Sequence, residues 1–257
     1  MTQTDLVEYV KEENQPQDED IKYEWNYVAD KINPITGPNC NDEFYQVGPL
    51  LKTSWDQGCS YNNLLGDCSN SYCNKQLTGC VATAMSQIMK YKHKPNSYNW
   101  NNMPLTYGTI DTQNLMKDVG NAVGMNYGCG SSSANSTDIA PAFNNLGYNA
   151  SYTSNYTHSR VLQQLDWGNP VILTGGRKKD NISWNMYTDG HAWVCDGYQY
   201  IDIKTIPCDG TSIGYVFLHM NWGWGGQYNT WFTAHNFNPG THTYNYGNCI
   251  IDHITPY

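Results

Sequence analysis

The sequence has few charged residues, no basic cluster and no long apolar run. Asp, Glu, Lys and Arg make up 14% of its 257 residues, well below the share of about 25% in average soluble proteins. The formal net charge of −9 argues against a nucleic-acid partner, because binding to phosphates needs clustered Lys and Arg. No stretch of about 18 or more apolar residues occurs, so we expect no membrane-spanning helix.

Two further features are missing. The segment Met1–Asp5 shows neither the basic nor the apolar part of a secretory signal. We therefore expect either a cytosolic protein or one made with a signal that this chain does not carry. No Cys-x-x-Cys pair occurs, which makes a zinc site an unfavoured use of the cysteines.

Nine cysteines are nevertheless present. If one of them is a catalytic thiol, an even number remains that can pair, which favours an oxidising compartment. Cys68 and Cys73 flank a short Ser/Asn loop and are the best candidates for a disulfide. The alternative is a set of buried free thiols.

The remaining composition suits a folded domain. Apolar residues make up 39% of the chain, and 21 Tyr and 9 Trp are among its residues. Residues 1–45 begin with an acidic stretch and end in a turn-rich segment, so we predict an N-terminal extension there. Residues 46–257 are predicted to form the main folded domain.

Hydrophobic spacing predicts helices in the first half of this domain and strands in the second. Apolar residues at helical spacing predict a helix over 80–91, which Thr78 can cap and Pro95 can stop. Weaker helical patterns cover residues 111–123, 138–146 and 159–165. Apolar runs or period-two alternation predict strands at 171–174, 191–198, 215–222 and 230–233. This order predicts an α+β fold, with a helical lobe packed on a β-rich lobe.

Cys80 is the first candidate for chemistry, because it begins the predicted helix over 80–91. Free N–H groups at a helix start stabilise an anion and lower the pKa of a thiol. Gly79, directly before it, leaves the approach to the sulfur open. The alternative role for Cys80 is that of a buried structural cysteine.

His191 follows Gly190 at the start of a predicted strand. A histidine on a strand that faces a cysteine on a helix is the arrangement that a thiolate–imidazolium pair requires. His219, on the neighbouring predicted strand, is a rival for this role. The other histidines have less ordered settings and are expected on the surface or in packing.

Two further segments supply polar groups. Gln57 lies in a loop ahead of Cys80, and its amide together with the Cys80 backbone N–H would make a two-donor oxyanion hole. Residues 221–226 (NWGWGG) offer an amide, indoles and glycines. Period two sends Asn221 and Trp222 to opposite faces of their strand, so only one of them easily faces His191. The alternatives are an ordinary loop glutamine and a glycine-rich aromatic hairpin.

The order of Gln57, Cys80, His191 and Asn221 is that of papain-like peptidases, and longer sequence blocks are more specific. These blocks are residues 49–57 (PLLKTSWDQ), 78–91 (TGCVATAMSQIMKY), 190–192 (GHA) and 221–226 (NWGWGG). On these blocks the sequence resembles the streptopain family of papain-like cysteine peptidases (family C10). The resemblance implies a papain-like two-lobed fold, with residues 46–257 as the catalytic domain. It also implies that residues 1–45 include the end of a propeptide.

The resemblance assigns a role to each candidate. Cys80 becomes the nucleophile, His191 the base and acid, and Gln57 an oxyanion donor, while Trp222 lies beside His191. Because the family is described as a Cys–His dyad, Asn221 is kept as a catalytic candidate but is expected to bond to backbone. Residues 126–134 (NYGCGSSSA) resemble the serine-rich stretch of the family's substrate cleft. The candidates for substrate binding are Ser131, Ser133 and Gly190.

The sequence thus predicts a secreted or cell-surface cysteine endopeptidase that acts through a thioester and needs no metal or cofactor. Its expected partners are protein or peptide substrates, and a propeptide or protein inhibitor. In papain the histidine-paired cysteine has a pKa of roughly 3–4, and we expect a comparably low pKa for Cys80. One alternative is a papain-fold acyltransferase or amidase that uses the same residues. The other is a non-catalytic, peptide-binding pseudopeptidase.

Overall fold

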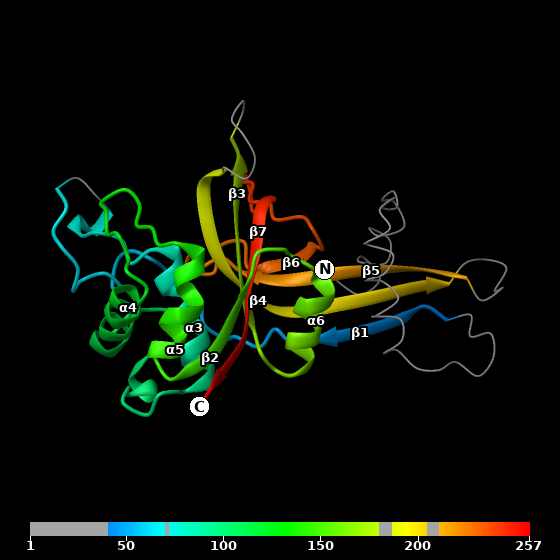
Figure 1. Cartoon of the computed structure of the whole chain (residues 1–257), viewed down its shortest axis with the longest axis horizontal. Helices are drawn as coiled ribbons and strands as arrows, with labels where there is room; N and C mark the ends of the chain where they lie inside the picture. The colour runs from blue at the N-terminus through cyan, green and yellow to red at the C-terminus, as the bar shows by residue number, and fades with distance from the viewer. Residues whose placement is uncertain (1–40, 70–71, 180–186, 205–210) are drawn as a thin grey trace.

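The computed structural model describes residues 41–69, 72–179, 187–204 and 211–257. Its helices and sheet separate into two lobes (Figure 1). The helical lobe contains α3 (Cys80–Lys92), α4 (Ile110–Ala122) and α5 (Ile139–Asn145). The other lobe is a sheet with α6 (His158–Asp166) packed against it. Short 3-10 turns occur at Tyr72–Asn74, Trp100–Asn102 and Ser136–Asp138.

The sheet has seven strands among the described residues, and all of their pairings are antiparallel. The strands are β1 (Glu43–Val47), β2 (Tyr148–Thr153), β3 (Val171–Lys178), β4 (Tyr187–Lys204), β5 (Ser212–Asn221), β6 (Thr230–Thr233) and β7 (Tyr246–Pro256). Their order is β2-β7-β3-β4-β5-β6. The long strand β4 pairs with β3 along its first part and with β1 along its second. His191 lies in the first part, opposite Gly175 of β3.

The two faces of the sheet contact different cores. On β4, Ala192 and Val194 belong to the core that the sheet shares with α3, α4 and α5. Trp193 and Cys195, which alternate with them, belong to a second core with α6 on the opposite face. This period-two division is the strand alternation that the sequence showed. It places the start of β4 between the helical lobe and an aromatic-rich core.

The helix α3 is the central helix of the structure. Every residue from Val81 to Met89 is buried, so the helix is covered on all sides and not only along its apolar stripe. Thr83, Ser86 and Gln87 are therefore enclosed together with the apolar residues. Buried polar side chains of this kind normally have hydrogen-bond partners, and the amide of Gln87 bonds to Thr53, Trp55 and Asn221.

The predicted α+β class and lobe arrangement are confirmed. The predicted helices correspond to α3, α4, α5 and α6, and the predicted strands to β3, β4, β5 and β6. The strands β1, β2 and β7 were not predicted. The proposed boundary at residue 45 falls inside β1, which pairs with β4. Residues 1–40 lie outside the described part of the chain, and the division into extension and catalytic domain stays a prediction.

No helix in the ranges that the structure describes is both long enough and apolar enough to cross a bilayer.

Candidate active site

Cys80 is the first residue of α3 and lies where this helix contacts β4. Its N-cap is Gly79, whose φ of 86° is a left-handed value that glycine tolerates. A Cβ atom at position 79 would also lie 2.8 Å from Sδ of Met125. Glycine therefore suits the backbone conformation here, and any side chain at this position would require Met125 to shift.

Two opposing influences act on the pKa of the Cys80 thiol. Burial raises its pKa, while the backbone N–H groups of Ala192 and Val81, and that of Cys80 itself, interact with the sulfur and lower the pKa. Burial is the larger influence, so with a neutral His191 the pKa of Cys80 lies above the ordinary value for cysteine. Burial thus opposes the lowered pKa that the helix start alone predicts.

Gln57 is tied to the start of α3 through its backbone. Its carbonyl oxygen accepts hydrogen bonds from the backbone N–H of Thr78 at 2.9 Å and from Oγ1 of Thr78 at 3.2 Å. Thr78 was predicted to cap the helix, but Gly79 is the N-cap and no side chain caps it. The Thr78 hydroxyl instead donates to the Gln57 carbonyl. This bond ties Gln57 to a residue that lies two positions before Cys80. Gln57 as a whole residue is half-buried, and its role as an oxyanion donor stays a prediction.

His191 is bonded through one ring nitrogen to backbone. Its Nε2 lies 2.9 Å from the carbonyl oxygen of Trp222. In the tautomer that donates from Nε2 to this carbonyl, Nδ1 is an acceptor. The carbonyl of Trp222 therefore fixes the tautomer of His191.

Aromatic rings surround the imidazole of His191. The nearest ring centroids are those of Trp224 at 4.8 Å and Tyr244 at 5.1 Å, and Trp222 is stacked at 6.1 Å. The expected aromatic neighbour is confirmed, although Trp224 is closer than Trp222. Burial among these rings lowers the pKa of His191 to about 4, against the smaller raising influence of the Trp222 carbonyl.

The described hydrogen bonds of the Asn221 side chain go to groups other than the imidazole of His191. Its Nδ2 donates to the carbonyl of Thr53 at 2.7 Å. Its Oδ1 accepts from Nε2 of Gln87 at 3.1 Å and from the backbone N–H of Gly223 at 3.2 Å. The expectation that Asn221 bonds to backbone is confirmed, and the structure does not place it as a third member of a triad.

The serine-rich stretch is fixed by its middle serine. Oγ of Ser132 donates to the carbonyl of Leu77 at 2.7 Å and accepts from the backbone N–H of Gly128 at 3.0 Å. Ser132 therefore holds the loop against the residues that precede Cys80. A role in substrate binding stays a prediction for the three exposed candidates, Ser131, Ser133 and Gly190.

The predicted disulfide between Cys68 and Cys73 is wrong. Cys73 bonds to Cys59, and Cys68 bonds to Cys129. The backbone N–H of Cys68 donates to the carbonyl of Asn74 at 3.0 Å, so Cys68 and the residue after Cys73 are paired through backbone while each sulfur bonds to another segment. Among the described cysteines, Cys80, Cys195 and Cys249 are free thiols, whereas Cys40 and Cys208 lie outside the described residues.

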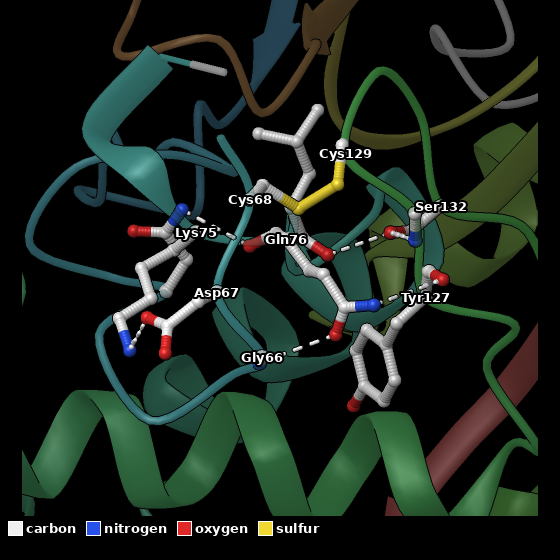
Figure 2. The surroundings of a disulfide bond; sticks show 11 residues. Gly66, Asp67, Cys68, Lys75, Gln76, Tyr127, Cys129 and Ser132 are labelled. Atoms are coloured by element: carbon white, nitrogen blue, oxygen red, sulfur yellow. Dashed lines mark hydrogen bonds and ion pairs between the residues drawn. A yellow bond between two sulfur atoms is a disulfide. The ribbon is translucent and has the colours of Figure 1, made fainter. Parts of the chain in front are cut away.

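Figure 2 shows how the Cys68–Cys129 disulfide and Gln76 join two loops. The side chain of Gln76 accepts from the backbone N–H of Gly66 at 3.2 Å and donates to the carbonyl of Tyr127 at 3.3 Å. The loop that follows Gln57 is thereby joined to the serine-rich stretch by a disulfide and by the hydrogen bonds of Gln76.

The model of the Peptidase C10 family matches residues 55–97 and 92–232, which is more than half of the chain. The chain belongs to this family. Streptopain from Streptococcus pyogenes is 31% identical over 208 residues, which cover 63% of this chain and 46% of streptopain. The thiol protease/hemagglutinin PrtT from Porphyromonas gingivalis is 28% identical over 83% of this chain and 27% of that protein. The chain thus spans less than half the length of these C10 relatives.

Solved structures show the same fold. Active wild-type interpain A, a cysteine protease from Prevotella intermedia, matches with a TM-score of 0.64 and 26% identity, over 80% of this chain and 94% of that one. A prointerpain A fragment matches with a TM-score of 0.60 and 22% identity, over 96% of this chain and 87% of that one. The C10 chain therefore has the papain-like fold that its sequence predicted.

Sequence reasoning missed several residues around this C10 site. Trp224 was visible within the NWGWGG block but was given no role. Tyr244 lies in a segment without a periodic pattern, and no signal pointed to it. Ser132 was given no role although its two neighbours were, and serine hydroxyls in turns can bond to nearby backbone. Gln87 was hidden within an otherwise apolar helix.

The Cys68–Cys129 disulfide should contribute strongly to stability. Removing a native disulfide typically costs about 2–4 kcal/mol. We therefore expect the free energy of unfolding of the Cys68→Ser/Cys129→Ser double variant to be lower by about this amount, and its urea midpoint to be lower as well. Equilibrium unfolding in urea measures it. Cys249→Ser, which changes a half-buried free thiol, is the matched control with a much smaller change. Equal stability of the two variants would contradict the prediction.

Proposed function

We propose that this chain is a cysteine endopeptidase, with Cys80 as nucleophile and His191 as base and acid. One observation carries the proposal. One of the backbone N–H groups that interact with the Cys80 sulfur belongs to Ala192, the residue next to His191, and the His191 ring is bonded through Nε2 so that Nδ1 can exchange a proton. A thiol at a helix start and an imidazole on the adjoining strand are the pair that peptide hydrolysis by a cysteine requires.

The reaction has two stages. Cys80 gives its proton to His191 and its sulfur attacks the peptide carbonyl, which forms a tetrahedral oxyanion. Gln57 and the Cys80 N–H donate hydrogen bonds to this oxyanion. His191 then protonates the leaving amine, the C–N bond breaks, and a thioester remains. In the second stage His191 takes a proton from water, the hydroxide attacks the thioester, and Cys80 leaves with the proton.

The substrates that we propose are proteins or peptides, and the proposal includes control by a propeptide or a protein inhibitor. A proform fragment of interpain A shares the fold over nearly the whole chain, which supports the first of these. We further propose secretion or a cell-surface location. The disulfides Cys59–Cys73 and Cys68–Cys129 support it, because such bonds persist in oxidising compartments.

An epoxide-based thiol inhibitor and a peptide library test this function together. We expect the epoxide to label Cys80 once per chain and to stop cleavage of internal peptide bonds. Labelling without any cleavage would instead favour a pseudopeptidase. Transfer of the acyl group to an added amine in preference to water would favour the acyltransferase alternative.

Replacing the proposed oxyanion donor Gln57 with alanine should lower kcat by roughly 10²–10³, the loss measured for one such donor in another protease. KM should change little, because the oxyanion exists in the transition state and not in the bound substrate. Steady-state kinetics with one peptide substrate measures both. Gln163→Ala, on the far helix α6, is the matched control. A change in KM alone would make Gln57 a substrate-binding residue.

A further inference from the structure

Gln87 lies on the same helix as the proposed nucleophile. It follows Cys80 by seven residues on α3, and residues at this spacing share one helix face. Its side chain is fully buried, with 0% exposure. Within the described part of the chain, its side-chain hydrogen bonds go to Thr53, Trp55 and Asn221 and not to Cys80, His191 or Gln57, so the proposed chemistry gives it no direct role.

The amide of Gln87 bonds to two other segments of the chain. Its Oε1 accepts from Oγ1 of Thr53 at 2.9 Å and from the backbone N–H of Trp55 at 3.3 Å. Its Nε2 donates to Oδ1 of Asn221 at 3.1 Å. A single buried side chain thus holds α3, the 53–55 segment and the end of β5 together.

Asn221 closes these contacts into a ring. Its Nδ2 donates to the carbonyl of Thr53 at 2.7 Å, so Gln87, Asn221 and Thr53 are each bonded to the other two. Both amide groups use their donor and their acceptor inside the protein. A buried network whose members bond to one another restricts the relative positions of the segments that carry it.

Each segment of the ring leads to one proposed catalytic group. The 53–55 segment continues to Gln57, and Asn221 is followed by Trp222, whose carbonyl binds His191. The helix α3 begins at Cys80. The backbone N–H of Gly225 also donates to the carbonyl of Trp55 at 3.0 Å. This hydrogen bond joins the 53–55 segment to the residues that follow Asn221.

We propose that Gln87 is a positioning residue that sets the spacing of the Cys80 sulfur, the oxyanion donor and the acceptor of His191. The proposal rests on the proposed function of the site. Asn221 and Thr53 are its partners, so Asn221 acts on catalysis through this ring. A displacement of about 1 Å from productive geometry can cost about 10²-fold in rate, and loss of the ring should therefore appear in kcat.

The first test replaces Gln87 with methionine, which has a similar length and no hydrogen-bonding amide. We expect Gln87→Met to lower kcat by roughly 10–100-fold, with KM within about 3-fold of the wild type. Ser86→Ala is the matched control, because Ser86 is the preceding residue, is equally buried and has no hydrogen-bond partner for its hydroxyl. It should keep kcat within about 2-fold. Folding of both variants is checked by thermal unfolding.

The second test uses a milder change and does not depend on Gln87→Met folding. Thr53→Val replaces the hydroxyl that donates to Gln87 with a methyl group and should also lower kcat. Thr53→Ser keeps the hydroxyl and should keep kcat near the wild-type value. In a double-mutant cycle, Asn221→Ala should add little to the loss already caused by Gln87→Met, since the two act through one ring.

The outcomes separate this proposal from the proposed function. If the wild-type chain cleaves no peptide, the proposed function fails, and the rate of Cys80 alkylation by iodoacetamide still reports whether the ring places the sulfur beside its base. The positioning role is overturned if Gln87→Met and Thr53→Val, both folded, match Ser86→Ala in kcat and in alkylation rate. Additive losses in the double-mutant cycle would overturn it as well.

Discussion

Replacing Cys80 with alanine should reduce peptide hydrolysis to the uncatalysed background while the fold is retained. The sulfur forms the covalent bond to substrate, and alanine has no group that can do so. The helix start should tolerate alanine, because Gly79 provides the N-cap without any bond from the Cys80 side chain and alanine favours helices. Steady-state kinetics and circular dichroism on the same preparation measure the two parts of this expectation.

The other free thiols provide the control. Cys249 is half-buried on β7, and Cys249→Ala should keep full activity. Cys195 is buried within β4, and burial together with the nearby Asp196 raises its pKa well above the ordinary value, so it is a poor nucleophile. More than a trace of activity in Cys80→Ala, lost again on replacement of Cys249, would transfer the chemistry to that residue.

The sequence predicted α3 well because its apolar residues repeat at helical spacing. It could not predict that Thr83, Ser86 and Gln87 are enclosed as well, since periodicity assigns polar positions to solvent. The side chain of Gln87, for example, is covered by the 53–55 segment and by Asn221 at the end of β5, to which it bonds. The polar face that looks like a surface in sequence is the place where the ring of Gln87 forms.

The strand β7 shows a second limit. Its partners β2 and β3 lie far before it in the chain, so nothing local indicates that residues 246–256 fill the space between them. Its mixed pattern of apolar and polar residues is also weaker than that of β5. Long-range pairing decides such a strand, and local propensity is a poor guide to it.

The candidate site was predictable in its members and less so in their contacts. Cys80, His191 and Gln57 follow from chemistry, chain order and family blocks. The acceptor of His191 is a backbone carbonyl, that of Trp222, and a carbonyl leaves no mark in a sequence. The disulfide partners likewise depend on which loops meet in space, and the nearest cysteine in sequence was the wrong partner.

Replacing His191 with alanine should abolish hydrolysis and also change the pH dependence of Cys80 alkylation. In the wild type we expect kcat/KM to rise with pH through a value of about 4, the pKa that burial gives to His191. Below this pH the imidazole is protonated while Cys80 is still a thiol, so no base is present. Above it the pair has lost one proton, and activity should persist until the second proton leaves at alkaline pH.

The pH–rate profile alone does not distinguish a neutral thiol and imidazole from a thiolate and imidazolium, because both forms carry the same number of protons. Burial of each group favours the neutral form. Attraction between opposite charges on the two groups would oppose this; it amounts to about 4 kcal/mol for charges 4 Å apart at an effective dielectric constant of about 20. Alkylation by iodoacetamide distinguishes the forms, since the thiolate is the species that reacts.

We expect wild-type Cys80 to react with iodoacetamide well below pH 7 and to lose this reactivity in His191→Ala. The variant should then react only at alkaline pH, above the ordinary thiol midpoint of about 8.5, because burial raises the pKa of Cys80. The matched control is His219→Ala, which removes the rival histidine on β5 that is bonded to Asp196 at 2.6 Å, and it should keep the low-pH reaction. A single alkaline limb in the wild type, unchanged in His191→Ala, would show that the two groups do not share a proton. His191 would then serve only as an acceptor in the transition state, and the low pKa expected for Cys80 would be wrong.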